Sequence, residues 1–315
     1  MNLHQRAFSL RLLLSLAFPL LWVACGTVPI SGRKSLNLVP ESQIIAQSAA
    51  QYTEYVRQMP HSDDPKQVER VREVCQRVAD AATSYLRKNN LNDLAQQMKW
   101  EFTVIADRRV NAFCMPGGKI VVYEGLLPVA QNEASLAIVL GHEIAHAVAK
   151  HSAEQMSKKI RQAYGTQIGG SILGAIGGQT MGGLAQVAAG QYFTFKNLKY
   201  SRDNESEADH MGLIFAAMAG YDPSVAVSFW QRMAQKSGGG NGSDLFSDHP
   251  SDAKRIAAIQ KLLPEAMAYY KAAGNTRTNT QATPSSKPAN TQPATQNKSA
   301  KSVSASSLYR KTKSK

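Results

Sequence analysis

The most informative sequence in this chain is the five-residue stretch His142-Glu143-Ile144-Ala145-His146. Asn132 precedes it and can cap a helix that continues through Leu136 and beyond. Residues four apart lie on one face of a helix, so both imidazoles can reach a single metal ion, and Glu143 can contact a water molecule beside that ion. Such a short motif also arises by chance on surface helices, so the sequence must supply a third ligand before a catalytic metal site is predicted.

The predicted third ligand is a carboxylate about sixty residues downstream. Ser152 occupies the position where a third histidine of the same segment would stand, and His151 is out of that register, so we interpret His151 as structural. The acidic sequence Glu205-Ser206-Glu207-Ala208-Asp209 offers the ligand instead, although it could also begin a solvated acidic helix. Glu205 and Asp209 share a helical face, whereas Glu207 points about 200° away from Glu205. We therefore predict Glu205 as the ligand and Asp209 as the acid that orients a ligand histidine.

The first 24 residues have the features of a signal peptide. A basic start is followed by a mostly apolar run from Leu12 to Ala24, which is too short to cross a bilayer. The sequence Val23-Ala24-Cys25-Gly26 resembles a bacterial lipobox, which predicts that Cys25 is lipidated and becomes the mature N-terminus. By the same resemblance, Gly26 favours the outer membrane. The alternative is an ordinary secretory signal and a soluble periplasmic protein.

Two cysteines remain in the exported part of the chain, Cys75 and Cys114. Because exported compartments are oxidising, an even number of cysteines favours a disulfide between them. The alternative is a pair of buried thiols. Our hypothesis is a Cys75–Cys114 disulfide.

The positive charge of the chain is concentrated at its C-terminal end. The net charge is +13, but nine of the 36 basic residues lie between Lys271 and Lys315, where there is no acidic residue. This segment is rich in Thr, Gln, Asn, Ser and Pro, so we expect 271–315 to be a disordered basic tail, either simply solvated or attracted to anionic lipid. The rest of the chain is nearly neutral, which argues against a groove for nucleic acid.

The segments between these ends predict a mainly helical α+β domain over residues 41–270, joined by a linker at 25–40. Asp64-Pro65 and Asp222-Pro223 are each typical of a helix start, and a last helix is expected at about 251–263. Apolar and polar residues alternate at 100–104, and the sequence KIVVY follows at 119–123. Both segments are predicted to be strands of a small antiparallel sheet. The second of these strands is a candidate edge for pairing with an extended substrate.

An uncharged, glycine-rich segment at 162–195 lies between the two predicted metal-binding helices. Its glycines recur every four residues, a spacing that allows close helix packing. We interpret the segment as a lid or hairpin that guards the substrate, since its Gln and Thr residues make it a poor bilayer span. Membrane insertion and a packing face between subunits are the alternatives.

Five stretches together resemble one known family: ISGRKSLNLV, NAFCMPGGKIVVYEGLL, LGHEIAHAVAKHSAE, YSRDNESEADHMG and HPSDAKRI. In this order they are similar to the HtpX/CaaX-prenyl-endopeptidase family of zinc metallopeptidases, and more narrowly to its bacterial outer-membrane lipoprotein branch. The resemblance covers about residues 28–263. It implies a zincin-type metallopeptidase domain with one Zn²⁺ per chain.

The resemblance also implies roles for individual residues. Zinc is expected on His142, His146 and Glu205, with Glu143 as general base and Asp209 as the orienting acid. His249, before Pro250, and Arg255 are expected to reach the site, where His249 either stabilises the transition state or blocks zinc as a fourth ligand.

These expectations predict an endopeptidase, lipid-anchored in the bacterial cell envelope on the periplasmic side of the outer membrane, that cleaves unfolded or misassembled envelope proteins. Its partners would be those substrates, the membrane and the outer-membrane protein assembly machinery. One alternative is a zinc-stabilised chaperone or assembly factor for outer-membrane proteins. An integral prenyl-protein protease is disfavoured, because no further apolar run of sufficient length follows residue 24.

Overall fold

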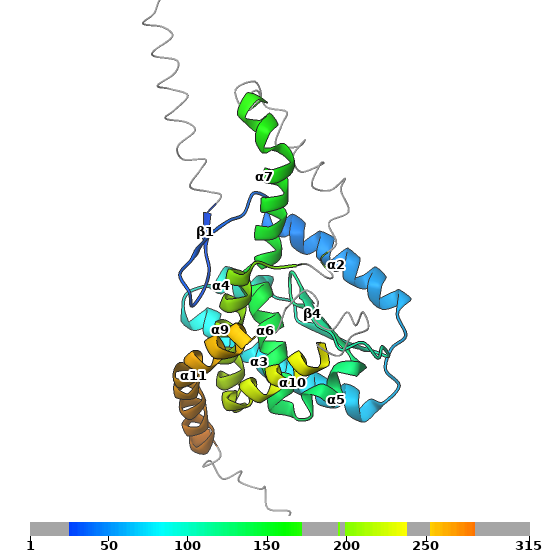
Figure 1. Cartoon of the computed structure of the whole chain (residues 1–315), viewed down its shortest axis with the longest axis vertical. Helices are drawn as coiled ribbons and strands as arrows, with labels where there is room; N and C mark the ends of the chain where they lie inside the picture. Colours follow the sequence, from blue (N-terminus) through cyan, green and yellow to red (C-terminus); the bar gives the residue numbers. More distant parts are fainter. Residues whose placement is uncertain (1–24, 172–194, 196–198, 238–252, 281–315) are drawn as a thin grey trace, which may run out of the picture.

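The computed structural model describes residues 25–171, 195, 199–237 and 253–280 of the chain (Figure 1). The predicted signal peptide, most of the glycine-rich segment, His249 and residues 281–315 lie outside these residues. The helices are α2 (Glu41–Gln58), α3 (Pro65–Lys88), α4 (Asn92–Gln97), α5 (Leu127–Ala130), α6 (Glu133–Val148), α7 (His151–Ser171), α9 (Arg202–Met218), α10 (Ala226–Ser237) and α11 (Ala253–Thr280), with 3-10 turns η1 (Glu124–Leu126) and η2 (Pro223–Val225). The strands are β1 (Cys25–Thr27), β2 (Lys34–Leu36), β3 (Glu101–Ile105), β4 (Ala112–Met115) and β5 (Lys119–Tyr123).

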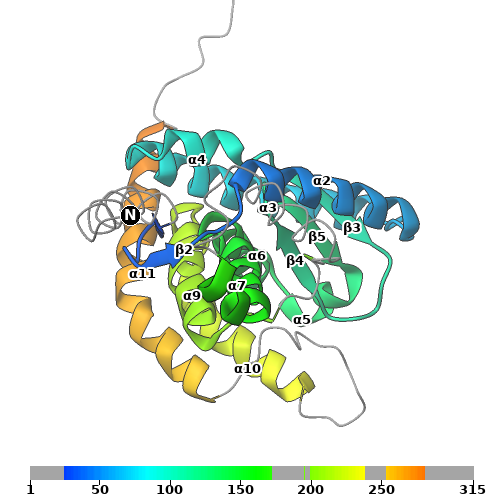
Figure 2. The ribbon, with the colours of Figure 1, turned by 90° about the horizontal axis from the view of Figure 1, so that it is seen from above.

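Helix α6 lies at the centre of the fold, and every residue from Ser135 to Val148 is buried. It packs against α9, α3 and β4, and Figure 2 shows α6 and α9 side by side. A helix that is apolar on all sides is stable only when it is surrounded. The metal-ligand motif therefore lies on the most completely enclosed helix of the described fold.

Several helices begin where the sequence predicts. The Asp64 side chain accepts hydrogen bonds from the backbone N–H groups of Lys66 and Gln67, with Pro65 in the first turn. Asn132 caps α6 by accepting from the Ser135 N–H. Asp222 caps the short turn η2, which leads directly into α10. These capping predictions are confirmed.

The three-stranded sheet has the order β3-β5-β4. The predicted antiparallel sheet is therefore wrong in part: β4 and β5 are antiparallel, but β3 and β5 are parallel. The tight turn at Gly117 and Gly118, with φ of +83° and +87°, returns the chain into β5 beside β4. Because β3 pairs on the other side of β5, residues 119–123 form the central strand and are not the predicted edge.

The segment at 25–40 is more ordered than the predicted linker. Strands β1 and β2 form an antiparallel hairpin, in which Cys25 pairs with Leu36. Its turn is closed by a hydrogen bond from the Val28 N–H to the Arg33 carbonyl (2.8 Å). Figure 2 shows this hairpin beside α9.

Helix α11 is longer than predicted and includes residues 271–280, which we expected in the tail. Pro264 lies inside it, and proline usually ends or kinks a helix. Packing explains the continuation, because Ala266 is buried and Tyr269 and Tyr270 lie against the core on the far side of Pro264. Among the described residues, none of the helices combines the length and the apolar character needed to cross a membrane.

The predicted disulfide is not formed. Cys75 and Cys114 are both free and buried, and both belong to the main hydrophobic core. Buried thiols behave as small apolar side chains. The core position of both residues accounts for their presence without a covalent bond.

Candidate metal centre

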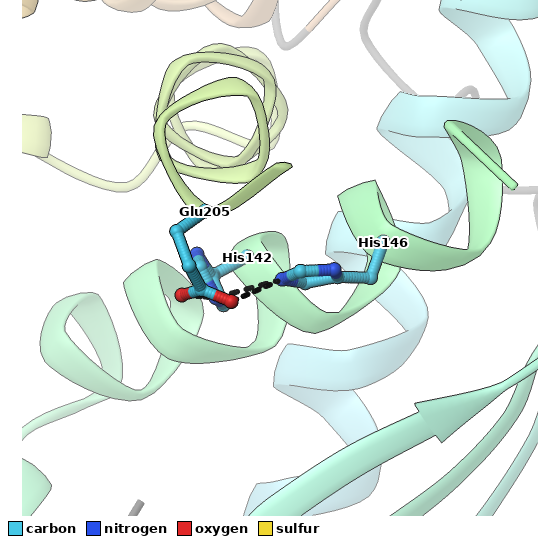
Figure 3. A group of neighbouring side chains, drawn as sticks. All are labelled: His142, His146 and Glu205. Atoms are coloured by element: carbon cyan, nitrogen blue, oxygen red, sulfur yellow. Dashed lines mark hydrogen bonds and ion pairs between the residues drawn. The ribbon is translucent and has the colours of Figure 1, made fainter. Parts of the chain in front are cut away.

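Helix α6 supplies two histidines that face one point. The side chains of His142 and His146 are each 1% exposed, and their rings are 4.7 Å apart between centroids. Glu205 approaches from the first turns of α9, and its carboxylate faces the Nε2 atoms of both rings (Figure 3). The helices can approach this closely because Gly141 and Gly212 face each other at their crossing.

The spacing of the three side chains fits a tetrahedral zinc ion. The Nε2 atoms of His142 and His146 are 3.1 Å apart. Glu205 places one oxygen 3.4 Å from Nε2 of His142 and the other 3.5 Å from Nε2 of His146. Two ligands of one tetrahedral zinc are about 3.3–3.5 Å apart, given zinc–ligand distances of about 2.0–2.2 Å. Two imidazoles and one carboxylate can therefore hold the ion and leave one position open.

Asp209 lies directly behind His142. Its Oδ1 is 2.9 Å from Nδ1 of His142, so the His142 Nδ1–H donates to the carboxylate and Nε2 is left for the metal. Burial and the charge of Arg255 act to lower the pKa of His142, but hydrogen bonding to Asp209 and Glu205 raises it to about 9. A metal ion binding here therefore displaces a proton.

Arg255 is turned toward carboxylates. Its Nε and Nη2 donate to the two oxygens of Asp209 at 2.8 and 2.7 Å, and its Nη1 lies 3.4 Å from Glu205. The guanidinium also stacks on Trp230, 3.6 Å from the ring centroid. Arg255 therefore reaches the site, with Nη2 3.5 Å from Nε2 of His142, and it balances the negative charge of Asp209 and Glu205.

Two residues that were not predicted to belong to the site, His151 and Glu207, lie there. His151, interpreted as structural, lies 2.9 Å from Nδ1 of His146 and is fully buried. Glu207, which points away from Glu205 as predicted, lies 2.8 Å from the other nitrogen of His151. Two sequence features could have indicated this contact: His151 follows His146 by five residues, and Glu207 is the second acidic residue of the Glu205–Asp209 segment.

Tyr200 covers one face of His146. The two rings are stacked with centroids 4.1 Å apart, and the Tyr200 hydroxyl lies 3.0 Å from the Ser152 Oγ. Burial raises the pKa of Tyr200 above its usual 10. No periodicity or motif in the sequence predicted this contact.

Glu143 follows His142 on α6 and is 2% exposed. Its position places a carboxylate beside the metal-ligand face of the helix. A helix with two histidines and this glutamate, and a third acidic ligand from a neighbouring helix, defines the class of gluzincin-type metallopeptidases.

The chain belongs to Peptidase family M48, whose profile matches residues 65–263. This match includes His142, Glu143, His146, Glu205 and Asp209.

Three relatives illustrate the similarity. The mitochondrial metalloendopeptidase OMA1 of Schizosaccharomyces pombe is 39% identical over 170 residues, which cover 54% of this chain and 48% of the relative. The human mitochondrial metalloendopeptidase OMA1 is 29% identical over 245 residues, which cover 76% of this chain and 46% of the relative. The beta-barrel assembly-enhancing protease of Yersinia pestis is 33% identical over 142 residues, which cover 44% of this chain and 29% of the relative. The chain thus spans about half or less of the length of these relatives.

Proposed function

We propose that this chain is a zinc-dependent endopeptidase of the bacterial cell envelope that cleaves unfolded or misassembled envelope proteins. The observation that carries the proposal is the spacing of His142, His146 and Glu205, which fits one zinc ion. Glu143 follows His142 on the same buried helix. When bound, zinc supplies the Lewis acidity that activates water and polarises the scissile carbonyl.

The proton transfers in this mechanism belong to Glu143. Its carboxylate accepts a proton from the attacking water, and it then gives that proton to the nitrogen of the leaving amine. The net reaction adds one water across one peptide bond. Because Glu143 is buried, few solvent molecules compete for this proton.

Strand β4 is the surface on which we expect the substrate to lie. It forms one edge of the three-stranded sheet and packs against α6, which carries the metal ligands. Among the described residues, no strand pairs with its outer edge. An extended peptide can add to such an edge through backbone hydrogen bonds, which require little side-chain identity and therefore suit unfolded substrates.

The envelope location rests on the N-terminal sequence and on one set of relatives. Cys25 and its neighbours resemble a lipobox, so we propose a lipid anchor on the periplasmic side of the outer membrane. The name of the Yersinia pestis relative refers to β-barrel assembly, which supports outer-membrane protein precursors and their assembly machinery as partners. The OMA1 relatives are named as mitochondrial, so they support the enzyme class but not this location.

The testing experiment compares wild type with Glu143→Gln on a reduced and alkylated, unfolded protein. We expect the variant to cleave at least about 100-fold more slowly while it retains zinc. Glu133→Gln is the matched control, because Glu133 is exposed in the first turn of the same helix. Equal cleavage by Glu143→Gln and wild type would show that the mechanism is wrong. Zinc binding and suppressed aggregation without any cleavage would favour the chaperone alternative.

His249 enters the proposal through the same assay. If it donates a hydrogen bond to the transition state, His249→Ala cleaves more slowly than wild type. If it blocks the open position of the metal, the same variant cleaves faster. Either outcome assigns the residue.

A further inference from the structure

His146 contacts a second ionisable group on the side away from Glu205. Its Nε2 faces His142 and Glu205, while its Nδ1 lies 2.9 Å from Nδ1 of His151. Nε2 of His151 in turn lies 2.8 Å from Oε2 of Glu207. His151 is fully buried and Glu207 is 8% exposed, so this row of side chains is shielded from water.

When His146 binds a metal, only one arrangement of protons gives every hydrogen bond among His146, His151 and Glu207 both a donor and an acceptor. Nε2 of His146 must then offer its lone pair, so the proton of the neutral ring is on Nδ1 and is donated to Nδ1 of His151. His151 consequently carries its own proton on Nε2 and donates it to the Glu207 carboxylate. Each donor meets one acceptor, and the row ends on an anion.

The Glu207 carboxylate is held in place from the N-terminal hairpin. Arg33 Nη2 donates to Oε2 at 2.7 Å, and Arg33 Nε lies 3.2 and 3.1 Å from Oε1 and Oε2. The Ser31 hydroxyl also donates to Oε1. A bidentate guanidinium–carboxylate pair fixes orientation as well as charge, and a lysine cannot reproduce this geometry. Arg33 precedes β2, so the hairpin that was expected to be a linker determines where Glu207 lies.

We propose that Arg33, Glu207 and His151 are positioning residues for the metal ligand His146. They hold its ring in one orientation with the proton on Nδ1, and they leave Nε2 to bind the metal. Asp209 and Arg255 have a similar role behind His142, so an arginine-held carboxylate supports each histidine ligand, directly at His142 and through His151 at His146. The inference rests on the metal site of the proposed function. It extends that site to Arg33, which lies outside the family match at residues 65–263.

Zinc affinity of the full chain tests this inference without any use of peptidase activity. Wild type, Glu207→Gln and His151→Phe are compared in competition with a coloured zinc chelator. We expect zinc affinity to fall about 10- to 100-fold in both variants, the usual effect of removing a partner behind a metal ligand. Substitution by Co²⁺ adds a spectroscopic reading, since a reoriented His146 ring changes the visible absorption of the bound ion.

Glu154→Gln is the matched control. Glu154 forms the other ion pair of Arg33, at 2.8 Å, and its further partners are Lys158 and Asn204 rather than His151 or His146. We expect this variant to keep wild-type zinc affinity within about threefold and an unchanged Co²⁺ spectrum. Circular dichroism of the metal-free proteins verifies folding. If Glu207→Gln does not fold, Arg33→Lys replaces it, because that variant keeps the positive charge and loses only the bidentate geometry.

The outcomes separate this inference from the proposed function. Zinc affinity and Co²⁺ spectra that are the same in Glu207→Gln, His151→Phe and Glu154→Gln would overturn the inference and leave the peptidase proposal intact. A wild-type chain that binds zinc and cleaves nothing would overturn the proposed function, while weaker zinc binding in Glu207→Gln would still support the inference.

Discussion

Gly141 and Gly212 are in direct backbone contact where α6 crosses α9. A Cβ atom added to Gly141 would lie 2.5 Å from the carbonyl oxygen of Gly212, and one added to Gly212 would lie 2.6 Å from the backbone nitrogen of His142. No β-carbon can be accommodated at these distances, because the obstructing atoms belong to the backbone. This contact sets the separation of the two helices that carry His142 and Glu205.

Alanine at position 212 is therefore expected to damage the metal centre from a distance. Gly212→Ala forces α9 away from α6, which moves Glu205 away from the histidines. We expect a loss of stability of about 2–3 kcal/mol, measured by urea unfolding, together with weaker zinc binding.

Gly274→Ala is the control for this prediction. Gly274 also lies in a helix, α11, but an added Cβ there meets nothing within 4 Å. Its substitution should be neutral or should stabilise by up to about 1 kcal/mol. Equal effects of the two substitutions would contradict the role assigned to the close crossing.

Local sequence patterns predict those features of the fold that depend on residues close together in the chain. Asp64 and Asn132 act within three residues of themselves, so their capping was predictable. The helical spacing of His142 and His146 is equally local. The choice of Glu205 over Glu207 followed from the 100° step per residue along one helix.

The features that could not be predicted from the sequence depend on contacts between segments far apart in the chain. Arg33 reaches Glu207 across 174 positions, and no periodicity within either segment encodes that contact. The stacking of Tyr200 on His146 was unpredictable for the same reason, because the two residues lie in different segments of the chain. The helix through Pro264 was also unpredictable, because its stability comes from packing against the core rather than from local propensity.

The Asp209 carboxylate is expected to control metal affinity through His142. Asp209→Asn removes the negative charge that holds the His142 Nδ1 proton and leaves the buried Arg255 poorly compensated. We expect zinc affinity to fall about 10- to 100-fold in chelator competition. Asp203→Asn, an exposed position on the same helix, should bind zinc as wild type does. Unchanged affinity in Asp209→Asn would show that the carboxylate does not orient the ligand.

The ion pairs of Glu154 predict a specific dependence of stability on pH. Burial acts to raise the pKa of Glu154, but hydrogen bonds from Arg33 and Lys158 lower it below its usual 4.5. A carboxyl group with a lowered pKa in the folded state stabilises the protein fully above its unfolded-state pKa. It loses this contribution as pH falls through the folded-state value.

Glu154→Gln should consequently destabilise the protein by about 1–2 kcal/mol at pH 7, and the difference from wild type should shrink as pH falls below 4.5. Urea unfolding at pH 7, 5, 4 and 3 measures this. Glu69→Gln is the comparison, since the Glu69–Arg72 pair is exposed and 3.7 Å long. Its effect should stay below about 0.5 kcal/mol. A Glu154 effect that is constant with pH would indicate lost packing rather than lost charge.

The two core cysteines are expected to be unreactive in the folded protein. Burial raises the pKa of both Cys75 and Cys114, so the reactive thiolate form is scarce at neutral pH. The test uses Cys25→Ser, which removes the only other cysteine of the chain. In mass spectrometry without reductant, we expect almost no alkylation of the native protein and two alkylated thiols after unfolding in urea. A protein that takes up no label in urea until a reductant is added contains the Cys75–Cys114 disulfide, and the free-thiol arrangement of the core is then wrong.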